Sequence, residues 1–157
     1  MGVLTGTSHG DEANDLFLFY QEASNALAAS EQYYMAAVAL ALAAEAVLLA
    51  YMLVEFQDQK GGDLQVPDHV GFAQLIEAAR EVGVLSAPID IPSHLGGDDP
   101  PAHLATDVVD KIRHFRNLIH PGKALRAGFD PRTFGEADYL LYSSMYDSIC
   151  HSLLYNL

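Results

Sequence analysis

Residues 35–54 constrain the fold most strongly, because this run of twenty residues holds a single charge, Glu45. A helix of this length can cross a membrane. Three features argue against a membrane span. Alanine is the commonest residue in the run, a carboxylate lies within it, and Lys and Arg do not flank it on both sides. A helix that is apolar on every side is otherwise the central helix of a bundle. We therefore expect a buried central helix and no membrane span.

Apolar residues recur at helical spacing along the rest of the chain, and no segment alternates with period two. Asp68 is a candidate cap, Gly83 and Pro121 are candidate helix ends, and Thr133 with Glu136 forms a capping-box pattern. The pattern predicts an all-α fold, an up-and-down helical bundle of about five helices in a single domain that covers residues 1–157. The expected helices span residues 11–29, 31–57, 68–83, 101–120 and 133–157.

The cysteine content bears on the compartment. Cys150 is the only cysteine, so an intrachain disulfide is impossible. The first ten residues lack both the basic end and the apolar run of a secretion signal. These features predict a cytoplasmic protein.

Charge is segregated along the chain, whose formal net charge is −13. Residues 111–132 hold six basic side chains against one acid, Asp130, which gives this segment a local charge of +5. The remaining two basic and twenty acidic residues give the rest of the chain −18. Local potential steers a ligand more than net charge does, so the segment is either an anion-binding surface or a solvated helix end. The six basic residues are Lys111, Arg113, Arg116, Lys123, Arg126 and Arg132.

Three side chains of this segment are spaced for one helix face. Arg116 lies four residues before His120, and Arg113 lies seven before it, with Asn117 beside them. His120 precedes a proline, which places its imidazole on the last helical turn at the mouth of a loop. An imidazole that moves protons near neutral pH, with guanidiniums that stabilise a phosphorane, suffices to cleave RNA without a metal.

Glu45 is a candidate partner for these cations. A lone carboxylate in an apolar helix is costly unless it is paired, and the arginines of the basic segment are the obvious cations to meet it. The pair would be either a structural ion pair or a contact that orients the site.

The string KIRHFRNLIHPGK, residues 111–123, resembles the signature helix of the HEPN superfamily, whose pattern is Arg, four to six residues, then His, often with Asn after the Arg. The resemblance extends to the Ala-rich helix with Glu45 and to a short helix that ends in Gly-Val-Leu at residues 83–85. The wording RNLIHPG, residues 116–122, is similar to that of uncharacterised bacterial members. Arg113 fits the motif arginine, since six residues separate it from His120. Arg116 and Asn117 form the usual Arg-Asn pair of the motif, but only three residues separate Arg116 from His120.

The resemblance implies a homodimer whose motif helices face each other. It also implies, in active members, a metal-independent endoribonuclease of a toxin, phage-defence or RNA-processing system, with an antitoxin or other protein as a further partner. On this hypothesis Arg113 and Arg116 bind the scissile phosphate, and His120 transfers a proton. Asn117 and Glu45 orient the side chains of these three residues. The expected RNA-phosphate contacts are Lys111, Lys123 and Arg126.

Two other hypotheses use the same residues. A non-catalytic helical module could bind RNA, a nucleotide or a protein through the basic face, or the segment could be a structural ion-pair network. No histidine or cysteine spacing matches a metal site, and no phosphate-binding loop or nucleotide fingerprint is present, so we expect no metal and no cofactor. Tyrosines at helical spacing in the last helix could stack on bases, line a dimer interface or, in the favoured interpretation, pack in the core. They are Tyr139, Tyr142 and Tyr146.

Overall fold

The structure, a computed structural model, describes residues 2–55, 65–67, 70–81, 83–84, 88–89 and 103–155, and helices dominate them. The expected all-α class is therefore confirmed, while the finer expectation of an up-and-down bundle stays a prediction. The helices are α1 (Gly6–Ala29), α2 (Tyr33–Ala50), the π-helix η1 (Tyr51–Glu55), α4 (Phe72–Glu81), α5 (Ala105–Asn117), α6 (Pro121–Ala127), the 3-10 helix η3 (Pro131–Thr133) and α7 (Glu136–Tyr155).

Two short antiparallel strand pairs accompany the helices. Strand β1 (Val3–Thr5) pairs with β2 (Gln65–Pro67), and β3 (Pro88–Ile89) pairs with β4 (His103–Leu104). With only two or three residues per strand, these pairs tie segments together without forming a layer.

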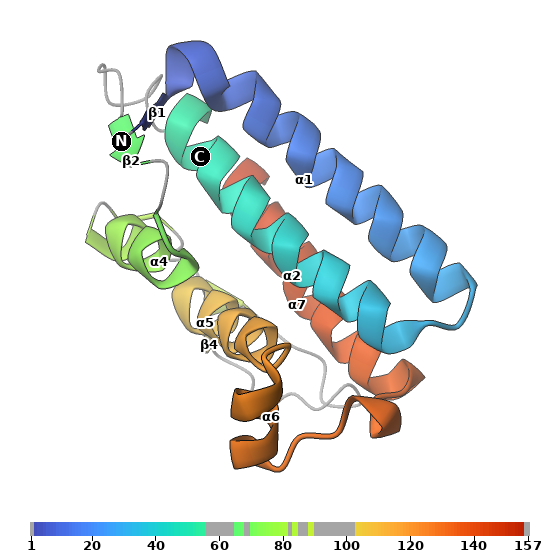
Figure 1. Cartoon of the computed structure of the whole chain (residues 1–157). Coiled ribbons are helices and arrows are strands. Elements are labelled where there is room, and N and C mark those ends of the chain that lie inside the picture. The colour runs from blue at the N-terminus through green and yellow to red at the C-terminus, as the bar shows by residue number, and fades with distance from the viewer. Residues whose placement is uncertain are drawn as a thin grey trace.

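Helix α2 is the centre of the molecule, as its composition predicts. It packs against α1, α4, α5 and α7 (Figure 1). Eleven of its eighteen residues are buried, and most of these are alanines, whose small side chains let the neighbouring helices approach closely. The hydroxyl of Ser24 on α1 donates a hydrogen bond of 2.8 Å to the buried carbonyl of Ala36, which fixes the α1–α2 hairpin.

Among the described residues, the segment Tyr33–Val54 is the one helix long and apolar enough to cross a membrane. More than half of its most apolar stretch is covered by the other helices, as in the core helix of a soluble protein. The expectations of no membrane span and of a cytoplasmic setting stay predictions.

Aromatic rings attach the α5–α6 region to the core. The ring of Phe115 on α5 lies 4.6 Å from Tyr142 on α7 and 5.3 Å from Phe134, measured between centroids. Tyr34 on α2 lies 6.0 Å from both Phe115 and Phe129. These edge and tilted contacts each add about 1 kcal/mol beyond the area they bury.

The tyrosines of α7 belong to this interior. Tyr139 and Tyr146 are buried, and the Tyr146 hydroxyl donates a hydrogen bond of 2.9 Å to Gln21 on α1. Tyr142 packs against the core through its ring contact with Phe115. The favoured core-packing interpretation of these tyrosines is therefore confirmed.

Helix boundaries differ from those expected. Helix α1 begins at Gly6, α5 begins only at Ala105, and Asp68 lies outside the described residues. The predicted capping box is wrong: the Thr133 hydroxyl donates to the Asp130 carbonyl. The cap of α7 comes two residues later, where the Gly135 N–H donates to the Asp138 carboxylate at 2.9 Å.

Candidate nucleic-acid interface

The candidate site is built around the junction between α5 and α6, where the structure corrects a predicted helix end. Helix α5 stops at Asn117, and a tight turn closed by 3-10-type hydrogen bonds carries the chain to His120. His120 is extended, with φ −77° and ψ 119°, because the following Pro121 disfavours the α conformation.

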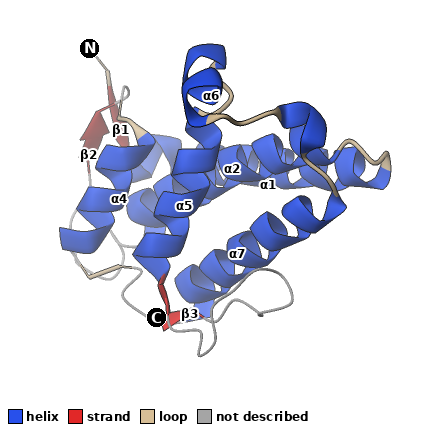
Figure 2. Cartoon of the chain, turned by 90° about the horizontal axis from the view of Figure 1, so that it is seen from below, coloured by secondary structure: helices blue, strands red, loops and turns tan. Residues whose placement is uncertain are grey.

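The same proline starts a helix that the sequence did not predict. The carbonyl of His120 accepts the N–H of Ala124 at 3.0 Å, and α6 follows with Pro121 in its first turn, where the missing proline N–H costs nothing. His120 therefore lies between two helices and not on the last turn of one. Figure 2 shows α6 standing out from the other helices.

The three predicted catalytic side chains are consequently not joined. His120 is exposed, and within the described residues no hydrogen bond or ion pair connects its ring to Arg113 or Arg116. The predicted contact between Arg116 and His120 depends on their i, i+4 spacing, which brings side chains together only where the backbone is α-helical. The turn at residues 118–120 interrupts the helix between them. Their convergence on one ligand stays a prediction.

The expected pairing of Glu45 is present. Its Oε2 lies 3.2 Å from Nη2 of Arg116, so α2 and α5 are linked through a half-buried ion pair. Burial raises the pKa of the Glu45 carboxyl above its ordinary value, and the opposing effect of the Arg116 charge is smaller. The Nε of Arg116 is buried and, within the described residues, has no hydrogen-bond partner.

Arg113 is held by Asp110, an acid outside the predicted site. Its Nε donates a hydrogen bond of 2.8 Å to Asp110, one turn earlier on α5, and its Nη2 lies 3.2 Å from Nε2 of His114. The hydrogen bond from Arg113 is the main cause that lowers the pKa of Asp110. The i, i+3 spacing of Asp110 and Arg113 was the signal that could have revealed this pair.

The basic segment thus divides into paired and unpaired cations. Arg113, Arg116 and Arg132 each pair with a carboxylate, the last with Asp130 at 3.0 Å. Within the described residues, no ion pair involves the exposed Lys111, Lys123 or Arg126. With six cations and three paired carboxylates, the net charge of this region is about +3. This is lower than the +5 counted along residues 111–132, because Glu45 and Asp110 lie outside that segment and pair with its arginines in the folded structure.

Asn117, the remaining predicted site residue, is the last residue of α5 and is partly buried. Its carbonyl accepts the N–H of His120 at 3.3 Å, so its described bond is a backbone contact within the turn. Asn117 therefore helps to fix the position of His120.

An apolar groove adjoins the α5–α6 junction. It encloses about 530 Å³ between the start of α2, α6 and the segment at residues 128–132. Tyr34, Ile119, Leu125 and Phe129 are among its lining residues. His120 does not line this groove.

No group of three or more His, Cys, Asp or Glu side chains is placed to hold a metal ion within the described ranges. Comparison with known proteins found no matching protein-family model, no matching curated protein and no matching solved structure.

Proposed function

We propose that the chain is a HEPN-like, metal-independent endoribonuclease that acts as a homodimer with its motif helices facing each other. The observation that carries the proposal is an exposed imidazole, His120, held by backbone bonds at the junction that follows two carboxylate-anchored arginines. The unpaired Lys111, Lys123 and Arg126 on the same two helices provide the positive charge that a phosphate backbone requires.

The proposed reaction is attack of an RNA 2′-hydroxyl oxygen on the adjacent phosphorus. The bond from phosphorus to the 5′-oxygen breaks, the 2′-hydroxyl proton passes to a base, and the 5′-oxygen takes a proton from an acid, which leaves a cyclic phosphate end. His120 fills one of these roles, and the His120 of a second copy would fill the other. Arg113 and Arg116, held in place by Asp110 and Glu45, stabilise the charge on the phosphorane.

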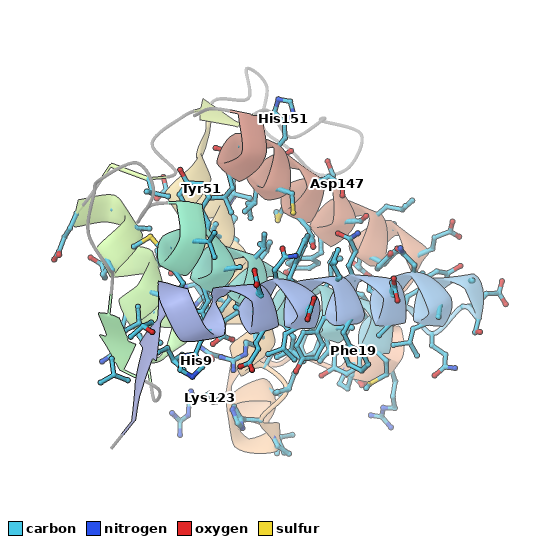
Figure 3. All side chains as sticks on the ribbon, turned by 90° about the horizontal axis from the view of Figure 1, so that it is seen from above. His9, Phe19, Tyr51, Lys123, Asp147 and His151 are labelled. Carbon is cyan, nitrogen blue, oxygen red and sulfur yellow. The ribbon has the colours of Figure 1, made fainter. Side chains whose placement is uncertain are left out.

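The decisive experiment incubates the purified protein with single-stranded RNA in excess chelator. We expect cleavage that yields cyclic phosphate ends and a loss of at least about a hundredfold in rate in His120→Ala, the usual contribution of a general acid or base. His151→Ala is the matched control, because it removes another exposed imidazole, which lies on α7 on the opposite side of the molecule from Lys123 (Figure 3). Cleavage that is equal in all three proteins, or absent from the parent protein, would overturn the catalytic proposal.

A second candidate is a non-catalytic module that binds RNA, a nucleotide or an acidic protein through the same surface. It is favoured by the engagement of both arginines with carboxylates and by the lack of a described contact between them and His120. Binding that weakens steeply with salt, unaccompanied by cleavage, would select it.

The biological setting is part of the same proposal. A cytoplasmic toxin, phage-defence or RNA-processing role, with an antitoxin or other protein partner, follows from the resemblance of residues 111–123 to the HEPN signature. Burial raises the pKa of the partly buried Cys150 thiol to about 11, so little reactive thiolate forms at neutral pH.

A further inference from the structure

The shape of the groove beside the α5–α6 junction is set by local hydrogen bonds. Gly128, with φ +70°, turns the chain at the end of α6, and the N–H of Phe129 donates to the Ala124 carbonyl at 2.9 Å. The Asp130 carboxylate then accepts the N–H of Arg132 at 2.9 Å, which begins η3. The segment that forms one wall of the groove is therefore fixed by its own backbone.

The interior of the groove is apolar and aromatic. Tyr34 and Phe129 line it, with their ring centroids 6.0 Å apart. Ile119 is 41% exposed and Leu125 is 82% exposed, and both also line the groove. The volume of about 530 Å³ lies within the usual range of a small-molecule pocket. Such a lining favours a ligand with a flat aromatic ring, whose apolar faces are buried there.

A fixed guanidinium lies at the rim of the groove. Arg132 is 89% exposed and lines the groove. Its Nε donates a hydrogen bond to one carboxylate oxygen of Asp130 and its Nη2 donates to the other, each at 3.0 Å. These hydrogen bonds lower the pKa of the Asp130 carboxyl, so the pair is ionised at neutral pH. The pair uses the Nε–Nη2 edge of the guanidinium, and the two N–H donors of the Nη1–Nη2 edge lie outside it.

The groove is continuous with the candidate site. Ile119 and Pro121 line the groove, and they flank His120 in the chain. The His120 side chain does not line it, so a ligand in the groove does not cover the imidazole. Because one sugar separates a base from its phosphate, a base that lies in the groove brings a phosphate to the α5–α6 junction.

We propose that the groove is a base-binding subsite for an unpaired guanine of the RNA strand. Bases of single-stranded RNA are recognised by stacking on aromatic side chains and by hydrogen bonds to their edges. Guanine presents two acceptors, O6 and N7, that match the two N–H donors at one edge of an arginine. Arg132 supplies this edge at the rim of the groove. Adenine is disfavoured, because it carries an amino group where guanine carries O6.

This inference deepens the proposed function and rests on it, since it names the base that the same RNA site selects. It uses none of the cations assigned to phosphate and none of the catalytic residues. Because Asp130 offsets the charge of Arg132, the guanidinium contributes hydrogen bonds to the base and little net charge to the binding of phosphate. A base in the groove cannot be paired in a duplex, so the substrate is single-stranded at this position.

The test compares short strands that share one backbone and differ in a single base. The strands consist of abasic sugar-phosphate units without 2′-hydroxyls, so they cannot be cleaved, and they carry guanine, adenine or no base at the centre. Competition titrations should show that the parent protein binds the guanine strand about tenfold more tightly than the adenine strand. The abasic strand should bind most weakly, since it lacks the stacked ring. The salt dependence should be the same for all three, because their phosphates are identical.

Two pairs of variants test whether the groove causes this preference. Arg132→Gln should abolish the discrimination between guanine and adenine, whereas Arg80→Gln on α4, which also removes an arginine paired with a carboxylate, should preserve it. Leu125→Ala should reduce the advantage of guanine over the abasic strand severalfold, whereas Leu140→Ala, at an exposed position of α7, should not. Each variant is compared across strands with the same phosphates, so an effect on phosphate binding cancels. Melting curves check that all four variants are folded.

Equal affinity of the parent protein for the three strands, or binding of none of them, would overturn the inference, as would a preference for guanine that persists in Arg132→Gln. A protein partner would then be the better candidate for the groove. Cleavage of RNA is measured in parallel and decides the proposed function separately. Guanine-dependent binding without cleavage defeats the ribonuclease and leaves the subsite standing, whereas cleavage that depends on His120 but not on the base does the reverse.

Discussion

At the scale of single residues, Glu45 shows how burial and pairing compete. Its carboxylate loses hydration inside the helical core and regains part of that energy from Arg116 at 3.2 Å. Because its pKa is raised, the lost hydration is the larger effect. The ionised carboxylate therefore opposes folding, and its presence in an apolar helix calls for a role other than stability.

Replacing this carboxylate should stabilise the protein at neutral and alkaline pH. An acid whose folded-state pKa is raised favours the fold fully below its unfolded value, near 4.5, and loses that contribution as pH rises through the folded value. Glu45→Gln keeps an oxygen for Arg116 without the charge, so we expect the variant to gain stability relative to the parent protein as the pH rises. Melting temperatures from pH 4 to pH 8 should show the difference grow with pH, while the exposed Glu81→Gln shows no such trend.

Gly10 is a second residue whose identity is fixed by its neighbour. A Cβ at this buried position of α1 would lie 2.3 Å from Cγ2 of Val54 in η1. We expect Gly10→Ala to destabilise the protein by about 1 to 3 kcal/mol, the usual cost of forcing an extra carbon into a packed contact. Denaturant unfolding measures this, and the double change with Val54→Ala should recover part of the loss. Full stability in Gly10→Ala alone would contradict the contact.

At the scale of elements, the junction between α5 and α6 shows what a linear pattern can predict. The apolar spacing of Val108, Val109, Ile112 and Phe115 predicts α5 correctly, since all four are buried. Pro121 predicts a helix end, but proline is also favoured in the first turn of a helix, and here it begins α6. The seven residues of α6, Pro121 included, are too few for a periodic signal, so α6 could not be recognised from hydrophobic spacing.

The end of α6 depends on a left-handed glycine. Gly128 has φ +70°, and the N–H of Phe129 then bonds to the Ala124 carbonyl at 2.9 Å. Gly128→Ala should cost about 1 to 2 kcal/mol, because a Cβ is strained in this conformation. Gly122→Ala, in the first turn of the same helix and with no atom within 4 Å of the added carbon, should be neutral or slightly stabilising. Thermal melts of both variants decide whether α6 ends as described.

At the scale of the whole molecule, sequence separates charges that folding brings together. The all-α class, the central helix and the pairing of Glu45 follow from composition and spacing, because they depend on periodicity and on the cost of a buried charge. The net charge of the candidate site could not be predicted from the sequence, since Glu45 pairs with Arg116 from a helix about seventy residues away in sequence. The break between Arg116 and His120 also escaped prediction, because it depends on the backbone of one turn.

The division into paired and unpaired cations predicts how RNA binding responds to salt. Each phosphate neutralised on single-stranded RNA contributes about −0.7 to the slope of log affinity against log salt, so three unpaired cations give a slope of about −2. Lys111→Gln should reduce the magnitude of this slope by about 0.7, because Lys111 is exposed and its charge is not offset by a described ion pair.

Arg80→Gln is the matched control, since Arg80 lies on α4 and already pairs with Glu77 and with Asp107 at 3.6 Å. Fluorescence titrations at several salt concentrations give both slopes. A parent slope near zero, or an equal change in the two variants, would mean that phosphate is not bound by the cations of the α5–α6 region.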